Sequence, residues 1–117
     1  MEKLNGWSQG EIKNGRKNGF GIFAFTKGNF KGDLYQGEYQ DGKYNGKGIY
    51  SWSNGNFYEG EWRDNQKNGK GIYHEKNGRR LEGEFKNSQP HGRAIMYESD
   101  GKAEEREYQN GNIIMRK

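Results

Sequence analysis

The side chains in this sequence that could do chemistry are a set of recurring glutamates and two histidines. Two carboxylates placed together can act as a general acid and a general base, and a histidine can transfer protons near neutral pH. The glutamates recur at almost regular intervals, as Glu11, Glu38, Glu61, Glu84 and Glu107. A carboxylate that every copy of a pattern contains is better explained by the hydrogen bonding and charge pairing of the pattern itself. We therefore interpret these glutamates as structural.

The histidines and the paired glycines give no stronger indication of catalysis. His74 and His91 lie in different copies of the pattern, so we interpret them as surface residues rather than as a catalytic pair. The Gly-x-Gly pairs at 46–48 and 69–71 lack the third glycine and the following helix of a dinucleotide-binding loop. The chain has no cysteine, and therefore no thiolate metal site and no disulfide. The sequence predicts no catalytic, cofactor or metal site.

These residues belong to a repeat. Gly37, Gly60 and Gly83 are 23 residues apart, and a fixed period of about 20–50 residues indicates an array of repeats. The first copy is looser, because its glycine precedes Gly37 by 27 residues and the four extra residues fall in 26–33. In the last copy Arg106 replaces the glycine. We divide the chain into a single domain, 1–117, with repeats at 7–33, 34–57, 58–80 and 81–103 and a shortened C-terminal cap at 104–117.

Each repeat contains the sequence of one β-hairpin. Asn-Gly and Asp-Gly turns, which tolerate positive φ, separate short segments with alternating side chains. Pro90 is expected in a turn, where its missing N–H breaks no ladder, and residues 108–113 predict a final hairpin that is tighter than the others. The fold class is all-β, with paired strands predicted at 8–12 and 19–25, 35–39 and 46–52, 58–62 and 69–73, and 81–85 and 92–97.

Alternation of side chains separates two faces of the predicted array. Tyr58, Gly60 and Trp62 share one face of their strand, and Glu61 lies on the other. If Glu61 pairs across from Lys70, the aromatic and glycine positions of both strands lie on one face, where the glycines leave space for rings over the backbone. The other face carries the recurring glutamates and a column of isoleucines, namely Ile22, Ile49, Ile72 and Ile95.

Seven basic residues are expected at or near the hairpin turns, where stacked repeats would align them into a stripe along one edge. Such a stripe could bind an anionic phospholipid membrane, a nucleic-acid backbone or an acidic peptide. The alternative, which we favour, is that they keep the turns soluble, because Asp41, Asp64 and the recurring glutamates dilute the positive field. The aromatic motifs of RNA-binding modules are absent, which argues against nucleic acid. The seven residues are Arg16, Lys17, Lys43, Lys47, Lys67, Lys70 and Arg93.

Composition favours a thin array over a thick globular core. Hydrophobic residues make up only 28% of the chain, but aromatic residues make up 15%, which is more than disordered chains contain. No segment approaches the roughly 18 apolar residues of a membrane span, and the first residues lack the apolar core of a signal peptide. These features predict a cytoplasmic location, with a membrane-peripheral location as the alternative. The net charge of +4 permits acidic partners without requiring them.

The pattern Tyr-x-Gly-Glu-(Trp/Tyr)-x-Asp-x(4)-Gly-x-Gly-x-Tyr resembles the MORN repeat (membrane occupation and recognition nexus). Residues 35–50 and 58–73 match it almost position for position, and the resemblance covers roughly residues 7–115. It implies consecutive antiparallel hairpins joined into one elongated, twisted, curved, single-layer sheet. It also implies a range of roles, from scaffolds and protein-binding modules to dimerising cytoskeletal proteins, and phospholipid binding has been proposed for such repeats. Departures occur at Ser8, Ile12, Leu81 and Ala94.

Three functions remain open at this point. The first, which we favour, is a non-catalytic protein-binding or scaffold module that binds a partner segment across one face of the sheet. The second is a peripheral binder of anionic phospholipid membranes, and the third is an architectural homo-oligomer joined through its end strands. Because Tyr and Trp concentrate binding energy at interfaces, we expect the partner on exposed aromatic residues, namely Tyr35, Tyr39, Tyr50, Trp52, Tyr58, Trp62 and Tyr73.

Overall fold

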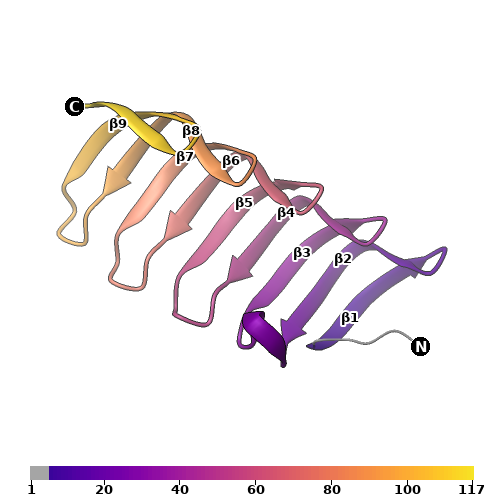
Figure 1. The fold of residues 1–117 in the computed structure, drawn as a ribbon. Coiled ribbons are helices and arrows are strands. Elements are labelled where there is room, and N and C mark those ends of the chain that lie inside the picture. The colour runs from indigo at the N-terminus through magenta and orange to yellow at the C-terminus, as the bar shows by residue number, and fades with distance from the viewer. Residues whose placement is uncertain (1–5) are drawn as a thin grey trace.

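The computed structural model describes residues 6–117, which form ten strands and one short 3-10 helix. The strands make a single antiparallel sheet in chain order, so the predicted all-β array of hairpins is confirmed. Five hairpins lie side by side along an array of 52 × 24 × 20 Å, with the first and last strands at opposite ends (Figure 1). The strands are β1 (Gly6–Lys13), β2 (Arg16–Phe25), β3 (Leu34–Gln40), β4 (Lys43–Ser51), β5 (Phe57–Arg63), β6 (Gln66–His74), β7 (Arg80–Lys86), β8 (Gln89–Tyr97), β9 (Ala103–Gln109) and β10 (Asn112–Arg116).

All five hairpins close through two-residue turns in which both residues have positive φ, the geometry that suits the right-handed twist of paired strands. Two of these turns contain no glycine: Asp64 and Asn65 have φ of 49° and 69°, and Asn87 and Ser88 have φ of 51° and 68°. The longer turns that we expected are therefore wrong, because the return strands β2, β4, β6 and β8 each begin three residues earlier than predicted. The last hairpin has the same two-residue turn and is not tighter than the others.

Pro90 does not lie in a turn, contrary to our expectation. It is the second residue of β8, directly opposite Phe85 of β7. The carbonyl of Pro90 accepts the N–H of Gly111 at 3.0 Å. The edge of Pro90 that points toward β9 therefore meets the last hairpin turn and not the strand itself. The ladder between β8 and β9 begins only at Gly92. The missing N–H of Pro90 is therefore tolerated beyond the end of that ladder.

The connections between hairpins share one backbone geometry. The N–H of Trp52 donates to the carbonyl of Asn56 at 2.8 Å, and the N–H of Gly55 donates to the carbonyl of Trp52 at 3.0 Å. The same two bonds recur 23 residues later in the next connection, and again in the one after it. This recurrence confirms the predicted turns at these connections.

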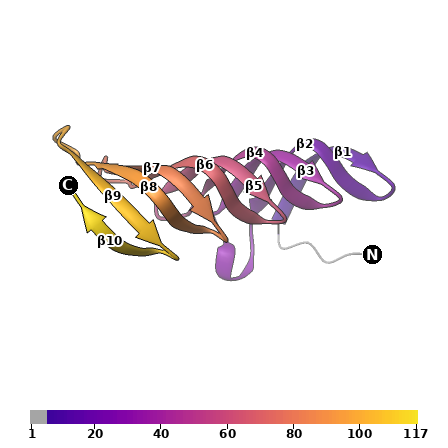
Figure 2. The ribbon, with the colours of Figure 1, turned by 90° about the horizontal axis from the view of Figure 1, so that it is seen from above.

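The insertion in the first connection forms a separate anchor. It contains the 3-10 helix η1 (Gly28–Phe30), which projects from the twisted sheet in Figure 2. Asp33, at the end of the insertion, is only 5% exposed. Its carboxylate accepts hydrogen bonds from the hydroxyl of Tyr50 at 2.7 Å and from the N–H of Ser53 at 2.9 Å. These bonds attach the insertion to the second hairpin.

The core lies on one face of the sheet, which we call the aromatic face. Tyr35 and Tyr58 are completely buried there, and their rings meet that of Trp62 edge to face at centroid distances of 5.6 and 5.3 Å. The ring of Tyr44 stacks on Tyr35 at 3.7 Å. The indole N–H of Trp62 donates to the carbonyl of Gly48 at 3.1 Å, so this contact also joins two neighbouring hairpins. Aromatic packing of this kind adds stability beyond the area that it buries.

Candidate binding groove

A row of glycines forms the floor of a groove on the face opposite the aromatic rings. Gly48 pairs with Gly60 and Gly71 pairs with Gly83 across neighbouring strands. On the aromatic face the ring of Tyr35 lies over Gly48, and that of Tyr58 lies over Gly71, so that a Cβ at either glycine would collide with a ring. Because side chains alternate between the two faces, this row presents bare backbone on the other face. The row continues in Ala94 and Arg106 at one end of the groove, so the floor follows from the alternation and not from the glycines alone.

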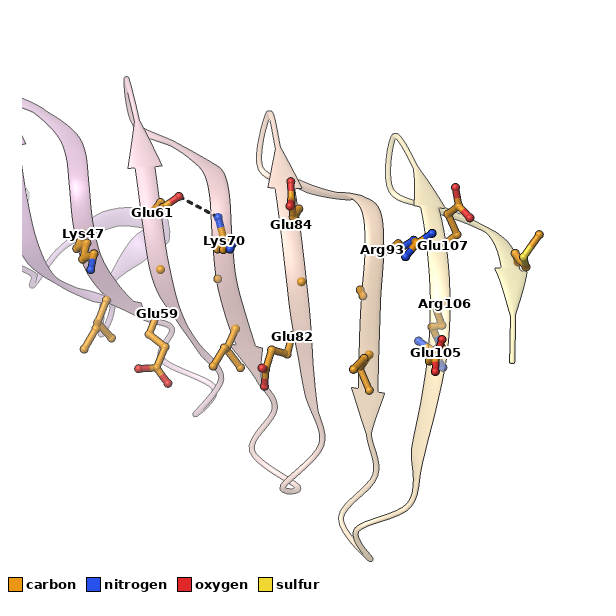
Figure 3. Close-up of a pocket in the computed structure, with 18 of the residues that line it drawn as sticks. Lys47, Glu59, Glu61, Lys70, Glu82, Glu84, Arg93, Glu105, Arg106 and Glu107 are labelled. Atoms are coloured by element: carbon orange, nitrogen blue, oxygen red, sulfur yellow. Dashed lines mark hydrogen bonds between the residues drawn. The ribbon is translucent and has the colours of Figure 1, made fainter.

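The recurring glutamates lie beside β-bulges. The strand register shifts next to Glu38 and next to Glu61, which frees a backbone N–H of the return strand. The Glu61 carboxylate accepts the N–H of Lys70 at 3.0 Å, and that of Glu38 accepts the N–H of Lys47 at 2.9 Å (Figure 3 shows the first). For these two glutamates the structural interpretation is confirmed.

One wall of the groove is a row of alternating charge, which we call the charged row. The strand register sets each cation of this row opposite a glutamate of the next hairpin. The pairing of Glu61 with Lys70 that we considered from the sequence is not formed, because the register of their hairpin shifts at Glu61. Three cations and three anions give the row no net charge. The charged row consists of Lys47, Glu61, Lys70, Glu84, Arg93 and Glu107.

The other wall alternates isoleucine with glutamate, and we call it the Ile–Glu row. Sequence reasoning predicted its isoleucines and placed Glu59 on this face, but it missed that Glu59, Glu82 and Glu105 recur with the same period of 23 residues. The period was the signal that could have found them. Glu59 bonds His74 at 2.7 Å, yet its side chain is 44% exposed. The Ile–Glu row consists of Ile49, Glu59, Ile72, Glu82, Ile95 and Glu105.

The two rows and the glycine floor enclose a groove of about 990 Å³. Figure 3 shows the labelled members of the two rows projecting on either side of the floor from β4 to β9. The groove extends to β10, where Met115 lines it, and Lys117 lies at the same end. The groove therefore runs along the array and crosses the strands instead of following one of them.

The aromatic residues predicted to bind a partner are brought together, but mostly not on an exposed surface. Five of the seven are at most 8% exposed: Tyr35, Tyr39, Tyr50, Tyr58 and Trp62. The expectation that these five are exposed is wrong, because they pack over the glycines and against one another and so form the core. Trp52 and Tyr73 remain half-buried and contact each other edge to face at 5.6 Å. Partner binding through these rings stays a prediction.

The seven predicted cations do not form one stripe. Lys17 and Lys67 lie on the aromatic face, where the Lys67 ammonium is 4.9 Å from the Trp52 ring centroid, and burial lowers the pKa of Lys67. Lys47, Lys70 and Arg93 belong to the charged row on the opposite face. Arg16 and Lys43 are exposed next to hairpin turns. The cations are thus divided between two faces and an edge, and their binding of an anionic ligand stays a prediction.

The two histidines are not brought together as a pair. His74, near the end of β6, bonds Glu59 and stacks on Phe57 with ring centroids 4.2 Å apart. His91, near the start of β8, accepts the N–H of Asn110 at 3.2 Å through Nδ1. Each histidine thus has its own structural contacts. Among residues 6–117 no group of three or more His, Cys, Asp and Glu side chains could hold a metal ion.

The described part of the chain contains no helix that is long and apolar enough to cross a membrane. A family model of the MORN repeat matches four segments, 9–30, 35–57, 58–79 and 82–102, which together make up more than half of the chain. These segments correspond to the first four hairpins of the sheet. A search of curated proteins found no match to the chain.

Proposed function

Because the chain belongs to the MORN repeat family, we propose that it is a non-catalytic binding module that holds a polypeptide segment of a partner protein in the groove. The observation that carries this proposal is the difference between the two faces. On the aromatic face the large side chains pack against one another, whereas the charged and apolar side chains of the groove walls are exposed or half-buried on both sides of a bare backbone floor.

The composition of the groove walls fits a peptide better than a small polar substrate. Concave sites that combine apolar contacts with a few placed polar groups bind ligands well, and repeat arrays commonly use an extended surface to do so. In this groove the isoleucines make the apolar contacts with the peptide, and the charged row fixes the orientation of the bound peptide. The cations are divided between two faces and an edge, which disfavours a flat anionic membrane as the ligand, because such a surface needs them on one side.

Affinity enrichment with the intact chain tests this proposal. We expect proteins that the wild-type chain captures to be lost with Ile72→Asp, which places a charge in the Ile–Glu row. The matched control is Ile114→Asp, because Ile114 is 56% exposed on β10 and does not line the groove. Circular dichroism of both variants checks that the sheet is intact. Equal capture by both variants would exclude the groove, and binding to phosphatidylserine vesicles without protein capture would favour the lipid alternative.

A further inference from the structure

The shape and charge of the groove restrict which segment it can hold, and this inference rests on the function proposed above. We propose that the groove holds a positively charged segment in the polyproline II conformation, with a basic residue at every third position along the Ile–Glu row. Three properties of the groove carry this proposal, namely its width, its period and the sign of its charge.

The groove is too narrow for an α-helix. Its walls are residues two apart on the same strands, such as Glu59 and Glu61 on β5, which sets their Cα atoms about 6.6 Å apart. The floor between these rows is only one residue wide, whereas an α-helix with side chains is about 10–12 Å across. An α-helix would therefore rest on top of the two rows, while an extended chain can lie between them.

The period of the walls selects one extended conformation. Glu59, Glu82 and Glu105 lie on every second strand, and so are about 9.6 Å apart. A polyproline II helix presents the same face every three residues, or about every 9.3 Å. A β-strand does so about every 6.6–6.8 Å. Over the two intervals between the three glutamates, the polyproline II spacing stays in register to within about 1 Å.

The Ile–Glu row determines the sign of the charge that the ligand should carry, because the charged row has no net charge. The carboxylate of Glu82 lies 3.9 Å from Nε of Arg80, which is too long for a hydrogen bond, and the side chain of Glu82 is 48% exposed. Arg106 and Lys117 add two cations at one end of the groove, so the six glutamates that line it exceed its five cations by one. A lysine or arginine of the ligand can place its charge on each glutamate and its methylene groups on the neighbouring isoleucine. The row therefore suits basic side chains at its own period.

Fluorescence anisotropy with labelled peptides at about 0.15 M salt, where the Debye length is about 8 Å, tests this inference. The probe is a peptide of four Lys-Pro-Ala units. The matched control is an isomer of the same composition with lysine at alternate positions. We expect the period-three peptide to bind the full chain about tenfold more tightly than its isomer. We also expect a loss of about tenfold with the triple variant Glu59→Gln, Glu82→Gln and Glu105→Gln.

A control variant removes both signs of charge from the opposite wall, by replacement of all six residues of the charged row with glutamine. We expect it to retain affinity to within about threefold, since the row carries no net charge before or after the change. Equal binding of the two peptides, equal losses in the two variants or no binding of either peptide would each overturn the inference. The peptide test can fail while the Ile72→Asp variant no longer captures the protein partners of the wild-type chain. In that case the proposed function stands, and only the inferred identity of the bound segment is wrong.

Discussion

The two faces of the sheet are built from alternate residues of the same strands, but they are packed very differently. On the aromatic face Tyr35 and Tyr58 are completely buried, whereas on the groove face Ile49 is 36% exposed. The glycine row makes the difference, because each missing side chain on the aromatic face accommodates a ring from a neighbouring position. A sheet of one layer can therefore form its core on one side and leave the other side free. The stabilising core therefore lies on one face and the proposed binding groove on the other, and this separation can be tested.

The largest expected effect comes from alkaline pH, through the buried tyrosines of the aromatic face. Burial among neighbouring rings raises the pKa of Tyr35, Tyr39, Tyr50 and Tyr58, and it raises the pKa of Tyr44 to about 12. Their pKa in the unfolded chain is about 10, so the folded state binds more protons above this pH. The stability that these tyrosines contribute is fully present below about pH 10 and is lost as pH rises toward 12 and beyond.

A pH titration followed by circular dichroism and by tyrosinate absorbance checks this prediction. We expect the sheet signal to be lost together with the appearance of tyrosinate from the buried rings. Ionisation of all the tyrosines near pH 10 with an intact sheet would show that the aromatic face is not the stabilising one.

Truncation of one side chain on each face gives the next largest effect. Tyr58→Ala removes a completely buried ring and the hydrogen bond from its hydroxyl to the carbonyl of Glu61, so we expect the free energy of unfolding to fall by about 3–5 kcal/mol. Ile72→Ala, on the groove face, removes a half-buried side chain and should cost about 1 kcal/mol or less. Chemical denaturation of both variants measures the difference. Similar losses in the two would remove the distinction between the faces.

The bulge glutamates provide a smaller effect within the groove face itself. Glu61→Ala leaves the backbone N–H of Lys70 without its acceptor, so we expect a loss of about 1–2 kcal/mol in the free energy of unfolding. Glu84 holds the same position in the next repeat, but it accepts no hydrogen bond from the part of the chain that the structure describes. Glu84→Ala should change stability by no more than about 0.5 kcal/mol. Thermal melts compare the two variants. A larger loss of stability for Glu84→Ala than for Glu61→Ala would contradict the stabilising role assigned to the hydrogen bond of Glu61.

The smallest effect is expected for Tyr39→Phe on the aromatic face. The hydroxyl of Tyr39 is buried without a hydrogen-bond partner among the described residues, and Phe85 already holds the corresponding position two repeats later. Removing an unsatisfied buried hydroxyl should raise the free energy of unfolding by up to about 1 kcal/mol. A differential scanning measurement of Tm checks the sign. A clear decrease would mean that this hydroxyl has a favourable contact in solution.

The repeat and its turns made most of the fold predictable from the sequence. The spacing of Gly37, Gly60 and Gly83 predicted consecutive hairpins, and the alternation of side chains predicted which residues share a face. The exact strand starts were not predictable, because turns such as Asp64–Asn65 place two non-glycine residues at positive φ. Propensity alone disfavours this conformation, but the twist of the paired strands requires it.

The site was predicted less well than the fold, for a physical reason. Alternation assigns Tyr58 and Trp62 to a face but does not tell whether the rings on that face stand free in solvent or lie on the backbone. The outcome depends on how rings from neighbouring strands fill the space over Gly60 and Gly71, which is a property of the assembled sheet. The groove could not be foreseen either, because its walls depend on the register between several strands, which the alternation within one strand does not determine.

Each hairpin turn after the first is also bonded to the hairpin before it. The N–H of Asn65 donates to the carbonyl of Tyr44 at 3.1 Å, and its side-chain oxygen accepts the N–H of Tyr44 at 2.8 Å. The next turn repeats this with Ser88 and Lys67. The backbone hydrogen bond between a turn and the preceding hairpin does not depend on side-chain identity. The junction between two hairpins can therefore be the same at different places in the array. The molecule is therefore extensible: duplicating a unit of 23 residues inserts two strands and lengthens the sheet by about 9.6 Å, while both neighbours retain the junction that they already have.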